Sequence, residues 1–169
     1  MTDRNGSRED FTPLLSRDDE VKLAAATPVP VLITAESRVA RVACARLIHD
    51  NGLGRPAPFV SARPVEASSQ TISTEADRVT DADDMAHWFD QAAGGTLFID
   101  DIDGLNRQEQ EHLLWRLEEH ALGRVRVIVG TGRSLRADIA AGAFSDALFY
   151  RLNVIHVDLF GRQTEFGDA

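Results

Sequence analysis

The sequence has a single cysteine and no long apolar run, and these two scarcities already limit the class of protein. Cys44 has no second cysteine with which to form an internal disulfide, as is usual for proteins of a reducing compartment. No apolar segment approaches the about 20 residues that a transmembrane helix needs. The N-terminal stretch MTDRNGSRED also lacks the apolar core of a signal peptide. We therefore expect a cytoplasmic protein that has no membrane partner.

Basic residues are scarce as well. Lysine and arginine number 18 against 27 aspartates and glutamates, which gives a formal net charge of −9. A surface of this sign repels a phosphate backbone, so we expect no direct DNA binding and favour a protein as the partner. The five histidines show no metal-ligand spacing, and the sequence therefore predicts no metal site.

Apolar, β-branched runs alternate with segments of helical periodicity over most of the 169 residues. The sequence predicts strands over residues 29–35, 57–62, 96–104, 124–130 and 153–159. It predicts helices over residues 18–26, 39–52 and 84–95, a further helix after Asn106, and two short helical pieces between residues 134 and 152. Strands that alternate with helices indicate an α/β fold, here a three-layer sandwich around a five-stranded, mostly parallel sheet.

A single domain over residues 18–160 accounts for this pattern. Residues 1–17 are predicted to form a flexible N-terminus and residues 161–169 a tail. The polar stretch 63–84 has no sustained period, so we expect a mobile loop there.

The helix after Asn106 has the clearest local signals. Asn106 and Glu109 have the spacing of a capping box, in which each side chain accepts a hydrogen bond from the other residue's amide. Leucines give this helix an inner face, and we expect Trp115 to face the core as well. The same expectation holds for Trp88 and Phe89 on the preceding helix.

Two predicted strand ends carry the residues of chemical interest, because ligands of parallel sheets bind beyond the carboxyl ends of the strands. The first strand leads into the turn AESRVARV, and the third ends in Asp100 and Asp101. A phosphate site at such a turn needs glycines for its backbone geometry, a lysine, and acids that hold Mg²⁺. The turn has no glycine. Paired acids by themselves are equally typical of a solvated strand end.

Four segments, in the right order and spacing, resemble the AAA+ domain of sigma-54-dependent transcription activators. PVLITAESRVARVACARLIH resembles the P-loop segment of that family, and FDQAAGGTLFIDDIDGLNRQEQEHLLWRLEE resembles its Walker B segment. RVRVIVGTGRSL is similar to the sensor strand, and FSDALFYRLNVIHVDL is similar to the segment that carries arginines acting across the subunit interface. The resemblance implies a bacterial P-loop NTPase fold, ATP with magnesium as ligand, and a role in transcription regulation.

The P-loop segment departs from the family at the positions that bind phosphate. Where the family has its three glycines and its lysine, this sequence has, in order, Ala35, Arg38, Ala40 and Arg41, and only Glu36 and Ser37 are retained. A Cβ at a positive-φ position costs on the order of 1 kcal/mol and blocks close approach of the backbone. We therefore expect an ordinary strand–helix connection and a vestigial nucleotide site, of which Glu36, Ser37, Arg41 and Asp100 would be the remaining residues.

The residues that the resemblance assigns to catalysis are altered too. Asp101 replaces the Walker B glutamate, which withdraws the carboxylate by one methylene group. Gly132 stands at the position of the sensor asparagine, and Ser145 stands at the first arginine position. Arg151 retains the second arginine. Asp101 and Arg151 are the catalytic candidates, although Arg151 would equally pair with Asp100 or Asp101 of its own subunit.

Two further family features are expected to be absent. In the family, the sigma-contacting loop lies between the second and third strands, where this chain has the polar stretch 63–84. GAFSDA at 142–147 resembles the motif of that loop, but it follows the fourth strand. After Asp158 the chain runs LFGRQTEFGDA, so we expect neither the helical lid nor a C-terminal helix-turn-helix.

These observations favour a non-hydrolysing interaction or regulatory module that binds a protein: a related AAA+ activator, a second copy of itself, or transcription machinery. The substitutions argue against an enzyme and predict no cofactor. A domain that still binds ATP with magnesium, or hydrolyses it weakly, is the alternative. A receiver-like phospho-acceptor ranks last, because the first strand ends with only Glu36 as an acid.

Overall fold

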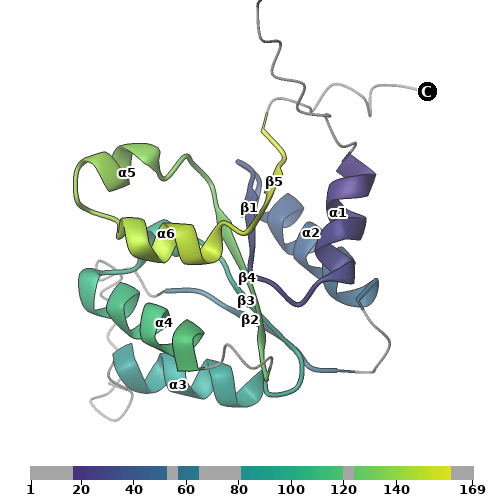
Figure 1. The fold of residues 1–169 in the computed structure, drawn as a ribbon, viewed down its shortest axis with the longest axis horizontal. Helices are drawn as coiled ribbons and strands as arrows, with labels where there is room; N and C mark the ends of the chain where they lie inside the picture. The colour runs from purple at the N-terminus through teal and green to yellow at the C-terminus, as the bar shows by residue number, and fades with distance from the viewer. Residues whose placement is uncertain (1–16, 53–56, 65–80, 120–123, 161–169) are drawn as a thin grey trace, which may run out of the picture.

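The computed structural model describes residues 17–52, 57–64, 81–119 and 124–160 (Figure 1). Its strands are β1 (Val31–Thr34), β2 (Phe59–Ala62), β3 (Thr96–Ile99), β4 (Arg126–Thr131) and β5 (Ile155–Asp158). Its helices are α1 (Arg17–Ala26), α2 (Arg38–Asp50), α3 (Asp81–Gln91), α4 (Arg107–Glu119), α5 (Arg136–Ala140) and α6 (Asp146–Leu152), and a 3₁₀ turn covers Ile102–Gly104. The five-stranded α/β fold predicted from the sequence is confirmed.

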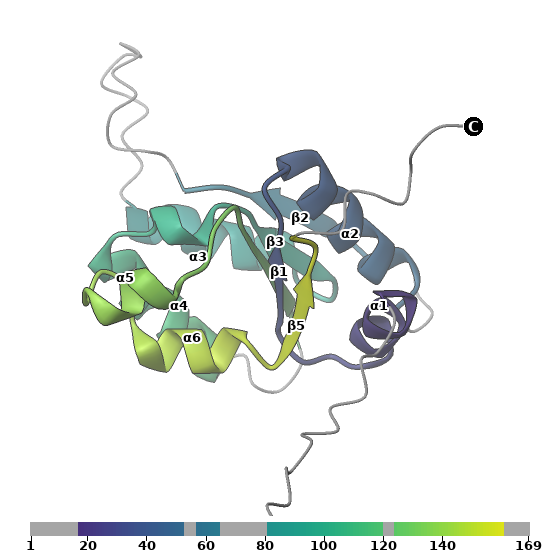
Figure 2. The ribbon, with the colours of Figure 1, turned by 90° about the horizontal axis from the view of Figure 1, so that it is seen from above.

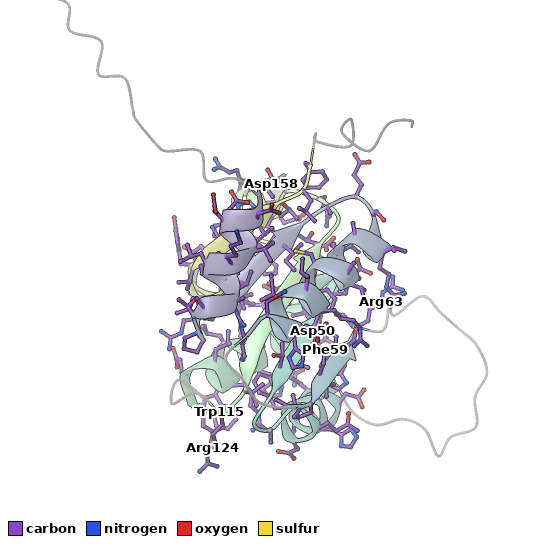
Figure 3. All side chains as sticks on the ribbon, turned by 90° about the vertical axis from the view of Figure 1, so that its right-hand side faces the viewer. Asp50, Phe59, Arg63, Trp115, Arg124 and Asp158 are labelled. Carbon is purple, nitrogen blue, oxygen red and sulfur yellow. The ribbon has the colours of Figure 1, made fainter. Side chains whose placement is uncertain are left out.

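The sheet has the strand order β2-β3-β4-β1-β5, and every neighbouring pair is parallel. The register sets Thr34 beside Thr131 on β4 and beside Asp158 on β5. The carboxyl ends of the strands therefore form one edge of the sheet, which we call the carboxyl edge. In Figure 3 Asp158 marks this edge at the top, and Arg124, which precedes β4, marks the opposite amino edge at the bottom.

Successive side chains of a strand point to opposite faces of the sheet, and helices pack on both faces to give three layers. Val31 and Ile33 belong to the core cluster on the side of α1 and α2, whereas Leu32 belongs to the cluster on the side of α3, α4 and α6. Figure 2 shows α1 and α2 on one side of the sheet and the other helices on the opposite side. Buried parallel strands need apolar residues on both faces, which is why these strands read as continuous apolar runs.

The capping box predicted at the start of α4 is confirmed, whereas the predicted start of α3 needs correction. The capping box is formed: Glu109 Oε2 accepts from the Asn106 amide at 2.6 Å, and Asn106 Oδ1 accepts from the Glu109 amide at 3.0 Å. Helix α3 begins at Asp81, three residues earlier than predicted. The rest of the predicted 63–84 loop lies largely outside the described residues, as do residues 1–16 and the tail 161–169.

The prediction that Trp115 faces the core is wrong. Its side chain is 52% exposed, while Leu113 and Leu117 are buried. Successive helical residues are rotated by about 100°, so Trp115 lies nearly opposite both leucines. Phe89 is buried and Trp88 packs partly buried against the core cluster, as expected. No helix in the described part of the chain is long and apolar enough to cross a membrane.

Candidate functional site

The carboxyl edge brings the turn after β1 next to the acids after β3. The Ala35 amide donates to the Thr131 carbonyl at 3.2 Å, which continues the β1–β4 pairing by one residue. Helix α2 then starts at Arg38, with Ser37 as its N-cap in extended conformation (φ −77°, ψ 119°). Ser37 Oγ accepts from the Ala40 amide at 3.3 Å. Among the described residues of this turn none has a positive φ, so the turn is an ordinary capped helix start.

Arg41, in the first turn of α2, directs its guanidinium into the carboxyl edge and is only 3% exposed. Nε donates to Asp100 Oδ1 at 2.6 Å, and Nη2 donates to Asp100 Oδ2 at 3.2 Å and to Asp101 Oδ1 at 2.7 Å. Nη1 donates to the carbonyls of Ala35 at 2.7 Å and Glu36 at 3.2 Å. A guanidinium has five N–H donors, so these five contacts use the full donor capacity of Arg41.

Two further arginines approach the same acids from the solvent side. Arg38 Nε lies 3.3 Å from Asp100 Oδ2, and Arg63 Nε, just after β2, lies 2.7 Å from Asp101 Oδ2. Their side chains remain 55% and 46% exposed. We call Arg38, Arg41, Arg63, Asp100 and Asp101 the arginine–aspartate cluster. Asp100 is fully buried, and a buried carboxylate is tolerated only when it is paired and hydrogen-bonded.

Two glycines make room for this cluster. A Cβ on Gly130 would lie 2.6 Å from Asp100 Oδ1 and 3.2 Å from Arg41 Cδ. A Cβ on Gly132 would lie 3.2 Å from Arg41 Nη1. The glycine at position 132 is therefore matched to the arginine at position 41: a larger residue there would press on the guanidinium.

A second ion-pair group lies beside the cluster. Arg133 Nε donates to Asp103 Oδ2 at 2.8 Å, and the Thr131 hydroxyl donates to Asp103 Oδ1 at 3.0 Å. Arg133 Nη2 also lies 3.2 Å from Asp138 Oδ2. Burial raises the pKa of the Asp103 carboxyl, but the hydrogen bonds from Arg133 and Thr131 outweigh burial and hold that pKa below its usual value. The pKa of Arg133 is raised by its hydrogen bond to Asp103 and by the charge of Asp138.

The remaining predicted site residues do not converge on the cluster. Arg151 lies exposed in the last turn of α6, and within the described residues the ion pairs of Asp100 and Asp101 are made by the three cluster arginines instead. Ser145 caps α6, with its Oγ accepting from the Leu148 amide at 3.3 Å. GAFSDA, residues 142–147, covers most of the connection between α5 and α6 and the first two residues of α6.

We also searched the described residues for a group of side chains that could bind a metal ion. The described residues contain no set of three or more histidine, cysteine, aspartate or glutamate side chains that could hold a metal ion.

The fold is that of an α/β domain of the P-loop NTPase type, in which the turn after β1 and the acid pair after β3 lie together at the carboxyl edge. Residues 14–161 match the family model of the Sigma-54 interaction domain, and the chain belongs to this family.

Its relatives include a response regulator protein and a DNA-binding transcriptional regulator. The chain is 31% identical over 161 residues to the response regulator protein PilR of Pseudomonas aeruginosa, covering 86% of this chain and 36% of PilR. It is 37% identical over 149 residues to the DNA-binding transcriptional regulator NtrC of Azospirillum brasilense, covering 79% of this chain and 31% of NtrC. The chain thus spans about a third of the length of these curated relatives.

Solved structures show the same fold. The P-loop NTPase domain of the Sigma-54 transport activator from Escherichia coli matches with a TM-score of 0.62 at 21% identity, over 84% of this chain and 98% of that domain. NtrX from Brucella abortus, solved in complex with ATP, matches with a TM-score of 0.65 at 24% identity, over 84% of this chain and 35% of NtrX. At these identities the likeness concerns the fold alone.

Sequence reasoning selected Arg41, Asp100 and Asp101 but missed that they bind one another. It also missed Arg63, because this residue begins the polar stretch 63–84 and no spacing rule connects it to residue 101. One signal was present in the sequence: Arg41 and Gly132 depart from the family together, and the structure shows the two residues in contact range.

Proposed function

We propose that this chain is a non-hydrolysing protein-interaction or regulatory module of the sigma-54 interaction family, acting in transcription regulation. One observation carries the proposal: the Arg41 guanidinium is buried between Asp100, Asp101 and two main-chain carbonyls, with all its donors used. The family's ligand is ATP with magnesium, and the fit of the present residues to that ligand decides between this proposal and an ATPase.

The acid pair fits the metal poorly. Mg²⁺ takes carboxylate oxygens and waters as ligands in near-ideal octahedral geometry. Here three of the four oxygens of Asp100 and Asp101 accept hydrogen bonds from Arg41, and the fourth lies 2.7 Å from Arg63 Nε. A metal would have to displace a buried guanidinium, and breaking a buried ion pair costs about 3–5 kcal/mol.

The turn fits the phosphates poorly as well. A phosphate cradle needs amide groups that point away from the chain toward the anion. In this turn the Ala40 amide donates to Ser37 Oγ, and the Arg41 amide donates to the Ser37 carbonyl at 3.1 Å. These amides are engaged inside the helix start, and the Arg38 side chain projects from the position where the family has a glycine.

Isothermal titration with ATP and Mg²⁺ tests the proposal. We expect no binding heat near millimolar nucleotide. The matched control is the fourfold variant Ala35→Gly, Arg38→Gly, Ala40→Gly, Arg41→Lys, which restores the family's three glycines and its lysine and is expected to gain binding. Micromolar affinity of the unaltered chain would contradict the proposal.

A residual ATPase is the second candidate, favoured by the retained acid pair and by the exposed Arg151. NtrX from Brucella abortus, which has the same fold, has been solved in complex with ATP and with ADP. A steady-state phosphate-release assay separates the two candidates. A rate that falls in Asp101→Ala would support the ATPase, whereas a rate unchanged by that substitution would place any activity outside this site.

The partner in this proposal is a protein, met in the cytoplasm: a related activator, transcription machinery or a second copy of the chain. The net charge of −9 supports this choice over DNA.

A further inference from the structure

A cavity lies at the amino edge of the sheet, at the opposite end of the strands from the arginine–aspartate cluster. Its volume is about 310 Å³, which is near the lower limit of the about 300–1,000 Å³ typical of small-molecule sites. The ends of α1 and α2 and the starts of β3 and β4 surround it, and its lining includes Ala25, Gly52, Thr96 and Arg126. The size suits a small ligand. We call this space the amino-edge cavity.

Arg126, the first residue of β4, brings a positive charge to the amino-edge cavity. Its Nη2 donates to the Ala24 carbonyl of α1, and within the described residues its buried Nε has no hydrogen-bond partner. Nη1 lies toward the end of α2, since a Cβ on Gly52 would be 3.6 Å from it. The ion pairs in the described part of the chain are made by other arginines. A half-buried guanidinium with five N–H donors therefore lies beside a cavity without a carboxylate from that part of the chain.

The polar side chains that share the cavity with Arg126 each have a partner already. His49 Nδ1 lies 2.8 Å from Thr96 Oγ1, and the Thr27 hydroxyl donates to the Leu23 carbonyl at 3.1 Å. These contacts hold the walls of the cavity in place. They leave the guanidinium as the group that would anchor a ligand.

The rest of the lining limits the charge and the shape of that ligand. Both α1 and α2 end at the cavity, and a helix C-terminus carries a partial negative charge. A single negative charge therefore fits beside Arg126 better than the two charges of a phosphate monoester. Ala25, Pro28, Ala57 and Val125 add apolar groups to the lining. A carboxylate forms charge-assisted hydrogen bonds with a guanidinium, and a short aliphatic chain would cover the apolar groups.

We propose that the amino-edge cavity binds a small aliphatic monocarboxylate, whose carboxylate pairs with the Arg126 guanidinium. The carboxylate supplies the counter-charge that the described residues do not give Arg126. A ligand held there contacts the ends of α1 and α2 together with the starts of β3 and β4, so it stabilises the folded chain by mass action. The site shares no residue with the arginine–aspartate cluster, and its occupancy is independent of the proposed function.

An NMR titration of the unaltered, ¹⁵N-labelled chain with sodium butyrate tests the site. Sodium chloride is exchanged for sodium butyrate so that the ionic strength stays constant. We expect saturable shifts of the Gly95, Thr96 and Arg126 amide signals, with a dissociation constant on the order of 1 mM. The absence of saturable shifts at these amides would overturn the proposal, whether or not the chain binds ATP.

Two further probes define the ligand class. Butyramide has the shape of butyrate without its charge, and we expect it to bind about tenfold more weakly or less, because a hydrogen bond to a charged group is lost. Equal binding of butyramide would overturn the pairing with Arg126. Inorganic phosphate should also bind more weakly than butyrate, and tighter binding of phosphate would overturn the choice of a monocarboxylate.

A pair of variants locates the anchor. We expect Arg126→Met to weaken butyrate binding about tenfold or more. Arg124→Met is the matched control, because Arg124 is exposed at the same edge (Figure 3) and its loss changes the net charge equally. It should bind butyrate as the unaltered chain does. Unchanged binding in Arg126→Met, or an equal loss in both variants, would contradict the proposal. The titrations of the unaltered chain decide it even if Arg126→Met does not fold.

Discussion

The two edges of the sheet each hold a buried or half-buried arginine, and the two arginines are neutralised in different ways. At the carboxyl edge, Arg41 donates five hydrogen bonds and faces two carboxylates. At the amino edge, Arg126 donates through Nη2 to the Ala24 carbonyl in the last turns of α1, and its Nε is buried without a hydrogen-bond partner in the described structure. Burial lowers the pKa of Arg126.

The difference shows how the charge of a buried acid is balanced at the carboxyl edge. A helix C-terminus carries only a partial negative charge, which suits a half-buried cation with incomplete hydrogen bonding. Asp100 is a fully buried carboxylate, and a buried carboxylate needs a cationic partner. Arg41 is that partner. The carboxyl edge therefore depends on a full positive charge for its stability more than the amino edge does.

The largest effect is expected for Arg41→Met. The variant leaves the Asp100 carboxylate buried without its main partner, which should lower the free energy of unfolding by about 3–5 kcal/mol. Urea denaturation followed by circular dichroism measures this change. Arg41→Met combined with Asp100→Leu removes both charges and should recover most of the loss. If the double variant is no more stable than the single one, the pair is not the cause.

A smaller loss is expected for Gly130→Ala. The added Cβ would meet Asp100 Oδ1 at 2.6 Å on a central strand, and overpacking of this kind costs about 1–3 kcal/mol. Gly132→Ala is the matched comparison, because its Cβ would meet the end of the Arg41 side chain at 3.2 Å and would reach the Ala35 carbonyl oxygen only at 4.0 Å. Thermal unfolding of the two variants should show the larger loss for Gly130→Ala; the reverse order would contradict the packing described for the cluster.

Arg126→Met should cost less than Arg41→Met. The substitution removes one hydrogen bond and a favourable interaction with the C-terminus of α1, together about 1–2 kcal/mol, and it also relieves the burial of a charge. The same urea experiment measures it. A loss as large as that of Arg41→Met would remove the contrast between the two edges.

The smallest effect concerns Asp103, whose pKa in the folded protein lies below its ordinary value of 3.8. A depressed folded pKa contributes stability that is present above the unfolded pKa and is lost as the pH falls through the folded pKa. Unfolding free energy should therefore decline below about pH 4, and the decline should be shallower in Asp103→Asn. Identical pH profiles for the two proteins would contradict this role of Asp103.

Sequence patterns predicted the secondary structure and the fold far better than the site. The strands and the Asn106–Glu109 capping box depend on local periodicity and spacing, which a sequence displays directly. Trp115 was misplaced because apolar character was given more weight than its angle to Leu113 and Leu117. Helix α3 begins early because Asp81 and the acids after it favour a helix N-terminus.

The site could be predicted only in its parts. Loss of the glycines from the turn predicts an ordinary helix start, and Ser37 forms one. Arg41 points inward because it pairs with Asp100, which is 59 positions away in the sequence. The space for its side chain is left by Gly130 and Gly132. Such long-range pairings have no local signature, so Arg63 and the closed cluster appear only in the structure.

Crystals grown with a non-hydrolysable ATP analogue and Mg²⁺ test the central claim most directly. We predict that the Arg41–Asp100 ion pair stays intact and that the turn between β1 and α2 holds no nucleotide density. Density for a triphosphate in that turn, with Arg41 displaced from Asp100, would contradict the account.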